Sequence, residues 1–85
     1  MTHELKTWPE YFQAVRNRSK TFEVRKNDRN FHPGDTVILQ EYDPITKQYT
    51  GEHETRDVGY VLVDYPALPP DYVVFTLYDT NKKDK

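Results

Sequence analysis

The chain has 85 residues, and its 14 acidic residues slightly outnumber its 12 lysines and arginines, which gives a net charge of −2. A chain of this length builds one modest core, and the lack of cysteine excludes disulfide bonds, a thiolate zinc site and a catalytic thiol. The first residues do not have the apolar run of a signal peptide, and no segment approaches the roughly 20 apolar residues of a membrane span, so we expect a soluble cytoplasmic protein without membrane contact.

A short edge strand and a helix are expected first. Residues 3–7 form a mixed run that suits an edge strand, and Pro9 and Glu10 favour the first turn of a helix. An apolar stripe with the spacing i, i+3, i+4 and i+7 predicts about ten helical residues that pack on the core. The stripe consists of Trp8, Tyr11, Phe12 and Val15.

The next strand, over residues 21–26, carries charge within the fold. Alternate residues of a strand share a face, so we predict that Phe22 and Val24 enter the core. Glu23 and Arg25 then lie next to each other on the opposite face, where they form either a functional pair or a simple surface ion pair.

The rest of the chain predicts an antiparallel sheet. Gly59 lies in the middle of a strand and indicates a bulge or a close backbone approach. One helix with four or five strands and no βαβ alternation predicts an α+β domain, with its sheet curled into a small barrel. We expect a tight turn at 31–35, strands at 36–42, 54–64 and 72–78, a hairpin loop at 43–47, an irregular segment at 65–71, a single domain over 1–80 and a disordered charged tail at 81–85.

Basic residues concentrate between positions 16 and 29, although the chain as a whole is acidic. Six basic residues stand there against Glu23 and Asp28. Such segregation is typical of a surface that binds an anionic ligand, with RNA or a nucleotide as the leading candidates. The six are Arg16, Arg18, Lys20, Arg25, Lys26 and Arg29.

Two motifs resemble the ASCH-like branch of the PUA superfamily, and most closely a family of short phage and bacterial proteins within it whose function is unassigned. The first motif is Lys20-Thr21-Phe22-Glu23-Val24-Arg25 after a helix, and the second is Phe31-x-x-Gly34-Asp35 before a β-branched strand. The ASCH pattern is Gly-x-Lys-x-x-Glu-x-Arg, in which Arg18 stands at the usual glycine. If that position needs a positive φ, Arg18 is strained or the turn is reshaped.

The resemblance implies a PUA-like β-barrel with the motif in a cleft that binds RNA or a modified nucleoside. Lys20 and Arg25 would contact a phosphate or a base edge, and Glu23 would orient Arg25 or accept a hydrogen bond from an exocyclic amine. We expect no metal and no cofactor. The surrounding positive field would come from Arg16, Arg18, Lys26 and Arg29.

Two other functions stay open. Some ASCH-type relatives hydrolyse acetylated cytidine with a lysine, a threonine three residues later and a distant glutamate, and others are ribonucleases. Here Lys20 fits the lysine, but Glu23 stands where the threonine would be, so a hydrolase would use Lys20 and Glu23 as acid and base. A phage-type module that binds a protein partner through its acidic surface is the second alternative.

Overall fold

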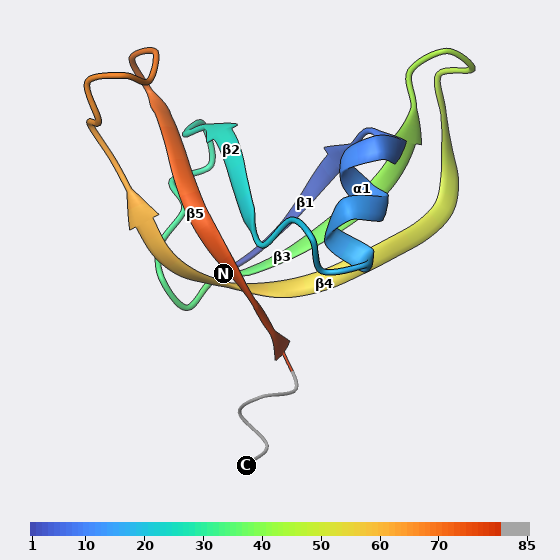
Figure 1. Ribbon diagram of the computed structural model, residues 1–85, viewed down its shortest axis with the longest axis horizontal. Helices are drawn as coiled ribbons and strands as arrows, with labels where there is room; N and C mark the ends of the chain where they lie inside the picture. The colour runs from blue at the N-terminus through green and yellow to red at the C-terminus, as the bar shows by residue number, and fades with distance from the viewer. Residues whose placement is uncertain (81–85) are drawn as a thin grey trace.

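The computed structural model describes residues 1–80 and consists of a curled sheet with one helix (Figure 1). Most elements lie where the sequence predicts them, but β4 begins at Gln48 rather than near Glu54. The predicted tail at 81–85 lies outside the described residues. In chain order the elements are β1 (Thr2–Thr7), α1 (Pro9–Arg16), β2 (Phe22–Lys26), β3 (Thr36–Asp43), β4 (Gln48–Leu62) and β5 (Tyr72–Asp79).

The five strands form one sheet in the order β1-β3-β4-β5-β2. The pair β1 and β3 is parallel, and the other pairs are antiparallel. Figure 1 shows the long β4 curving along the bottom of the view, so that the sheet rises on both sides as a cup. The prediction of a small, mostly antiparallel, curled sheet with an N-terminal helix is confirmed. The curl stops at a half-barrel, in which β1 and β2 are the two edges.

Gly59 lies where the β4–β5 register shifts, between Val58 and Val61. A Cβ atom at this glycine would overlap Thr76 Oγ1 and the Tyr78 ring. The sequence prediction of a bulge or close approach at Gly59 is therefore confirmed, and only a residue without a side chain fits there.

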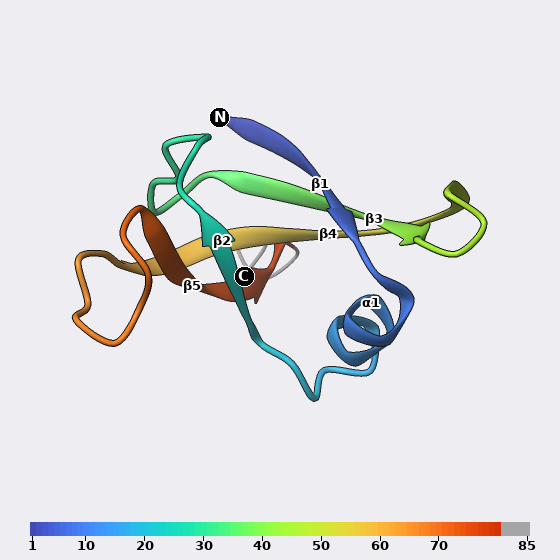
Figure 2. The same ribbon diagram turned by 90° about the horizontal axis from the view of Figure 1, so that it is seen from above.

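The core fills the concave side of the sheet, where α1 packs against β3 and β4 (Figure 2). Phe12 and Val15 of the helix are fully buried, as predicted. Trp8 and Tyr11 are 50% and 47% exposed, so the prediction that they belong to the core is wrong. The buried apolar cluster is Leu5, Phe12, Val15, Phe31, Val37, Leu39, Val58, Val73, Phe75 and Leu77.

The faces of β2 are reversed from the prediction. Phe22 and Val24 are 43% and 46% exposed, whereas Glu23 is only 3% exposed. Glu23 lies opposite the buried Phe75, so it shares the inner face of the sheet. The prediction that Phe22 and Val24 enter the core is therefore wrong.

The neighbouring strand explains why the pattern of β2 alone did not decide its orientation. β5 is apolar on both faces, because Val74 follows Val73 and precedes Phe75. Val24 therefore finds an apolar neighbour, Val74, on the outer face. Glu23 can be buried on the inner face because two cations compensate its charge there.

No helix within residues 1–80 is long and apolar enough to cross a membrane. The only helix in this part of the chain, α1, has eight residues.

Candidate functional site

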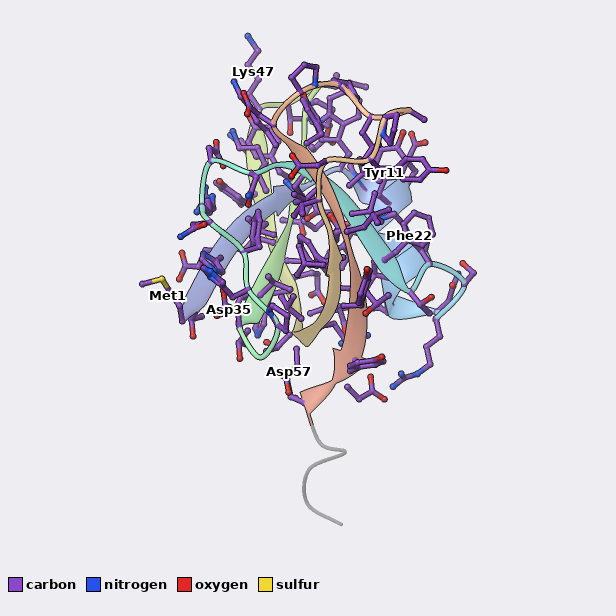
Figure 3. The ribbon with its side chains drawn as sticks, turned by 90° about the vertical axis from the view of Figure 1, so that its left-hand side faces the viewer. Met1, Tyr11, Phe22, Asp35, Lys47 and Asp57 are labelled. Atoms are coloured by element: carbon purple, nitrogen blue, oxygen red, sulfur yellow. The ribbon has the colours of Figure 1, made fainter. Side chains whose placement is uncertain are left out.

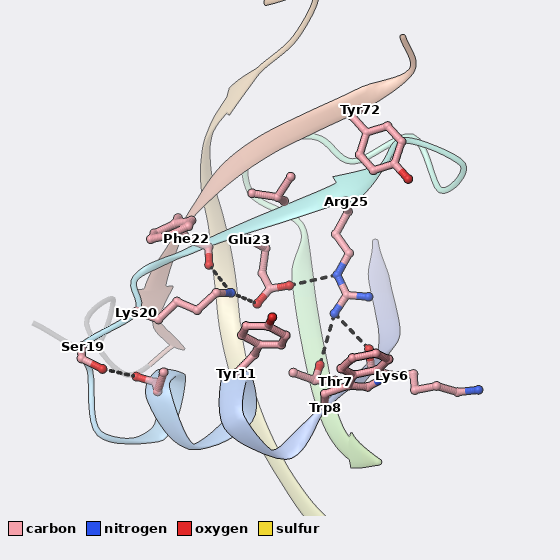
Figure 4. A pocket seen from close by; sticks show the side chains of 12 residues that line it. Lys6, Thr7, Trp8, Tyr11, Ser19, Lys20, Phe22, Glu23, Arg25 and Tyr72 are labelled. Atoms are coloured by element: carbon pink, nitrogen blue, oxygen red, sulfur yellow. Dashed lines mark hydrogen bonds and ion pairs between the residues drawn. The ribbon is translucent and has the colours of Figure 1, made fainter. Parts of the chain in front are cut away.

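A groove of about 980 Å³ opens between α1 and the free edge of β2. Trp8 and Tyr11 line it from the helix side, and Phe22 and Tyr72 line it from the strand side (Figure 4). In Figure 3, Tyr11 and Phe22 lie on the same side of the molecule. Lys20, Glu23 and Arg25 lie in a row between these rings in the view of Figure 4, and we call them the groove triad.

The triad is organised by the buried carboxylate of Glu23. Its Oε2 accepts a hydrogen bond from Lys20 Nζ at 2.6 Å, and its Oε1 accepts one from Arg25 Nε at 2.9 Å. The predicted contact between Glu23 and Arg25 is thus confirmed. Because the Glu23 side chain is only 4% exposed, this is no simple surface ion pair, and each charge-assisted bond is stronger than it would be in water.

Arg25 also joins the two edges of the sheet. Its Nη2 donates to the Lys6 carbonyl at 3.1 Å and to Thr7 Oγ1 at 3.2 Å, so β2 is tied to β1 by one side chain. Lys20 Nζ makes a second bond of 2.8 Å, to the Phe22 carbonyl. These bonds leave Nη1 of Arg25 without a hydrogen-bond partner among residues 1–80. They use two of the three protons of Lys20 Nζ, which also lies 5.1 Å from the centre of the Phe22 ring.

Sequence reasoning missed most of the groove lining, including Thr7, Trp8, Tyr11, Phe22 and Tyr72. Trp8 and Tyr11 carried a signal, the apolar stripe of the helix, but it was assigned to the core. Thr7 and Tyr72 carried no signal, since nothing in their local sequence shows that they approach β2. Thr7 supplies a hydroxyl beside Arg25, but it is 3% exposed and its Oγ1 donates to the Leu5 carbonyl.

Two of the predicted cations, Arg16 and Arg18, lie elsewhere, in a second hollow of about 350 Å³. Arg16 pairs with Glu54 at 2.5 Å and with Glu52 at 3.0 Å. Arg18 Nη1 donates to both carboxylate oxygens of Asp79 at 2.7 Å. The carboxylates of Glu52 and Glu54 therefore face the same side of their strand and bind one arginine.

In this second hollow the acidic and basic side chains shift each other's pKa values. The hydrogen bonds that Arg16 donates to Glu54 and then to Glu52 raise the pKa of Arg16, and the Asp79 carboxylate raises that of Arg18. Burial would raise the pKa of Glu54, but hydrogen bonds from Arg16 and Arg56 outweigh it and lower that pKa below the ordinary value. Arg56 extends the network, with Nη1 at 3.0 Å from Glu54 and Nε at 3.7 Å from Asp79.

Arg18 has a φ of 71°, the left-handed conformation that favours glycine. The backbone at the usual glycine position of the motif therefore does have a positive φ, and the ion pair with Asp79 holds the arginine there. The last two predicted cations lie outside the groove lining. Lys26 is exposed at the end of β2, and Arg29 is exposed in the following loop, 4.0 Å from Asp28.

A buried polar pair that the sequence did not predict lies at the far end of β1. His3 Nε2 is 2.9 Å from Asp35 Oδ2, and the His32 backbone N–H donates to the same oxygen at 3.0 Å. Burial would raise the pKa of Asp35, but these hydrogen bonds hold it below the ordinary range. The pair fastens β1 to the turn before β3. Within residues 1–80, no three His, Cys, Asp or Glu side chains gather as a metal-binding group would.

Similarity to known proteins agrees with one part of the sequence resemblance. The chain is 48% identical over 72 residues to the "Uncharacterized 12.9 kDa protein in GpA 3'region" of Escherichia phage P2. The alignment covers 78% of this chain and 64% of the phage protein, so the chain spans less than two thirds of that relative's length. The expectation of a short phage-type family without assigned function is confirmed. A family model matches residues 2–77, and the chain belongs to the family that this model describes, "Domain of unknown function (DUF3850)".

Proposed function

We propose that this protein binds RNA or a nucleotide, with one base seated between the aromatic walls of the groove and above the groove triad. The observation that carries the proposal is the pairing of half-exposed rings with partly exposed cations. Lys20 and Arg25 side chains are 18% and 24% exposed. Stacking of one base on an aromatic side chain contributes about 1–3 kcal/mol, and a cation beside it supplies hydrogen-bond donors.

The resemblance to ASCH-like and PUA-like proteins supports the same proposal. That resemblance implies a motif that lies in a cleft of a curled sheet, and here Lys20, Glu23 and Arg25 line a groove of a half-barrel. The positive φ of Arg18 matches the glycine of the ASCH pattern. We propose membership of that superfamily on these grounds.

The other four basic residues would contribute a weaker, more distant field. Arg16 and Arg18 are paired with carboxylates, and Lys26 and Arg29 do not line the groove. The triad itself carries one surplus positive charge, from two cations and one carboxylate. We therefore expect few phosphate contacts and a ligand held mainly by its base.

Binding without turnover fits the triad better than hydrolysis. A general acid or base must be free to exchange a proton with the substrate, whereas the carboxylate of Glu23 is covered and held by two cations. The Thr7 hydroxyl is buried, which leaves it poorly placed as a nucleophile. The hydrolase with Lys20 and Glu23 as acid and base remains the alternative, and its test is product formation from acetylcytidine or RNA.

A protein-binding module is the second candidate, and one observation favours it. Exposed apolar and aromatic side chains occur on three successive strands of the sheet, β2, β5 and β4, namely Phe22, Val24, Tyr78 and Tyr60. A partner bound there would be retained after Lys20 and Arg25 are neutralised, whereas an RNA ligand would be lost.

The fluorescence of Trp8 tests the proposal directly, because it is the only tryptophan of the chain and lines the groove. Titration with a single-stranded RNA of mixed sequence should change the emission. Lys20→Ala and Arg25→Ala should each weaken binding about tenfold, a loss of about 1.4 kcal/mol that is typical of one hydrogen bond to a charged group. Arg29→Ala, a cation of the same stretch outside the groove, is the matched control.

Salt dependence measures how many phosphates take part. Each contact with a single strand contributes a slope of about −0.7 to log affinity against log salt, and we expect no more than about two such contacts. RNA that leaves Trp8 emission unchanged, or affinity that Lys20→Ala and Arg25→Ala do not alter, would contradict the proposal. Wild-type hydrolysis of acetylcytidine or RNA that Glu23→Gln abolishes would favour the enzyme.

A further inference from the structure

We propose that the groove distinguishes purines by the hydrogen-bonding edge they present, and selects guanine, whose O6 and N7 are both acceptors, over adenine, whose N6 is a donor beside N7. This inference rests on the proposed function, since it names the base that the groove would hold. It follows from the way the triad uses its own hydrogen bonds.

The acceptor of the triad is closed to a ligand. Each oxygen of Glu23 receives a cation, Lys20 at 2.6 Å and Arg25 at 2.9 Å, and the carboxylate side chain is 4% exposed. Each carboxylate oxygen has a second lone pair, but the burial of the side chain beneath the two cations keeps an exocyclic amine of a bound base from reaching it. We therefore assign Glu23 to positioning the two cations, and not to accepting from an amine.

The charged atoms that remain open are donors only. An ammonium and a guanidinium have no acceptor atoms. Lys20 uses two of its three protons, on Phe22 and Glu23, and Arg25 leaves Nη1 unused within the described chain. Both cations line the same groove, Lys20 beside one oxygen of the Glu23 carboxylate and Arg25 beside the other (Figure 4).

A groove whose open charged atoms are donors only matches a base edge that presents acceptors. Guanine offers O6 and N7, the pair that arginine and lysine contact most often in base recognition. Adenine offers N7 with an amino group beside it. The N–H donors of that amino group would lie against the N–H donors of a cation, with no acceptor between them. The hydroxyls of Tyr11 and Tyr72 can both donate and accept, so they do not oppose either purine.

The acceptor that the donors meet could also be a phosphate oxygen, so the experiment uses ligands with and without phosphate. Guanosine, inosine, adenosine, 7-deazaguanosine and inorganic phosphate are titrated separately, and binding is followed through the single indole N–H signal of Trp8 by NMR. Guanosine and inosine should bind about five- to 150-fold more tightly than adenosine, the range for one two-bond base contact. 7-Deazaguanosine, which lacks the N7 acceptor, should bind more weakly than guanosine.

Variants test whether the triad causes the preference. Lys20→Gln or Arg25→Gln places an amide oxygen in the groove, which can accept from the amino group of adenine, so the guanosine-to-adenosine ratio should fall toward one. Arg29→Gln makes the same change outside the groove and should leave the ratio unchanged. If a triad variant fails to fold, the nucleoside series on the wild-type protein still decides.

Three outcomes would overturn this inference in distinguishable ways. A guanosine-to-adenosine ratio below about fivefold, the lower limit of the expected discrimination, contradicts the base preference while base binding stands. Binding of inorganic phosphate that displaces guanosine assigns the open donors to a phosphate and also leaves the proposed function intact. No binding of any nucleoside or of mixed-sequence RNA overturns both proposals.

Discussion

The groove and the second hollow take their cations from the same basic stretch, yet they differ in what surrounds those cations. In the groove, Lys20 and Arg25 share one carboxylate between aromatic walls. In the second hollow, Arg16 and Arg18, together with Arg56, meet three carboxylates in a polar setting. The groove triad keeps one surplus positive charge, whereas the three arginines and three carboxylates of the second hollow balance.

This difference shows that a run of basic residues does not by itself mark a binding surface. Arg16 and Arg18 find their carboxylates on β4 and β5, 38 and 61 residues away in the chain. Glu23, in contrast, is three residues from Lys20 and two from Arg25. Distant acids neutralise one part of the stretch, and a single local acid only orients the other.

The largest loss of stability should come from a substitution in α1, the helix that lies between the core and the groove. Phe12→Ala should lower the free energy of unfolding by about 3–5 kcal/mol, because this ring is fully buried. Tyr11→Ala removes a half-exposed ring of the groove and should cost about 1 kcal/mol or less, while it weakens RNA binding. Urea denaturation measures the two losses of stability, and the RNA titration measures the loss of binding. A Phe12→Ala protein as stable as wild type would contradict the helix packing.

The two central carboxylates can be compared by the same substitution. Glu23→Gln should destabilise the fold by about 1.5–3 kcal/mol, because a buried acceptor of two charged donors becomes an amide. Glu54→Gln should cost about 1 kcal/mol, since the Glu54 side chain is itself 20% exposed and Arg56, its less exposed partner, keeps Asp79. Chemical denaturation at neutral pH gives both values. Equal losses would mean that the groove triad is no more tightly held than the second hollow.

Arg18 tests how the second hollow compensates a strained backbone. Arg18→Gly and Arg18→Ala both remove the ion pair with Asp79, but only glycine adopts a φ of 71° without strain. Arg18→Gly should therefore be about 1 kcal/mol more stable than Arg18→Ala. Thermal unfolding of the two variants makes the comparison, and a more stable alanine variant would show that the local backbone relaxes when the arginine is lost.

The smallest expected effect is the pH dependence of folding stability. The pKa of Glu54 is lowered in the folded protein from its ordinary value of 4.5, so the ionised form stabilises the fold. That contribution is complete above the unfolded pKa and is lost as the pH falls through the lowered folded pKa. The stability difference between wild type and Glu54→Gln should thus be constant near neutral pH and shrink below 4.5. Urea denaturation across that pH range checks it, and a difference that grows in acid would contradict it.

Much of the fold could be predicted from the sequence because it rests on local patterns. Periodicity located α1 and the later strands, the Pro33-Gly34 pair located a turn, and Gly59 located the register shift. These features depend on backbone conformation and on spacing within a few residues. The motif of Lys20, Glu23 and Arg25 was likewise found from local sequence, through its place on one predicted strand and its resemblance to the ASCH pattern, and its ion pairs are local.

Only the tertiary structure decided which face of each element is buried. Periodicity finds the two faces of β2, but it cannot show which face is buried when the neighbouring strand β5 is apolar on both faces. In the structure Glu23, whose charge is compensated by two cations, is buried, and Phe22 is exposed. The short α1 packs with Phe12 on the sheet, which leaves Trp8 and Tyr11 to the groove. Burial and charge compensation depend on residues far apart in the chain, so the sequence determined the elements and the motif, and long-range packing determined the groove.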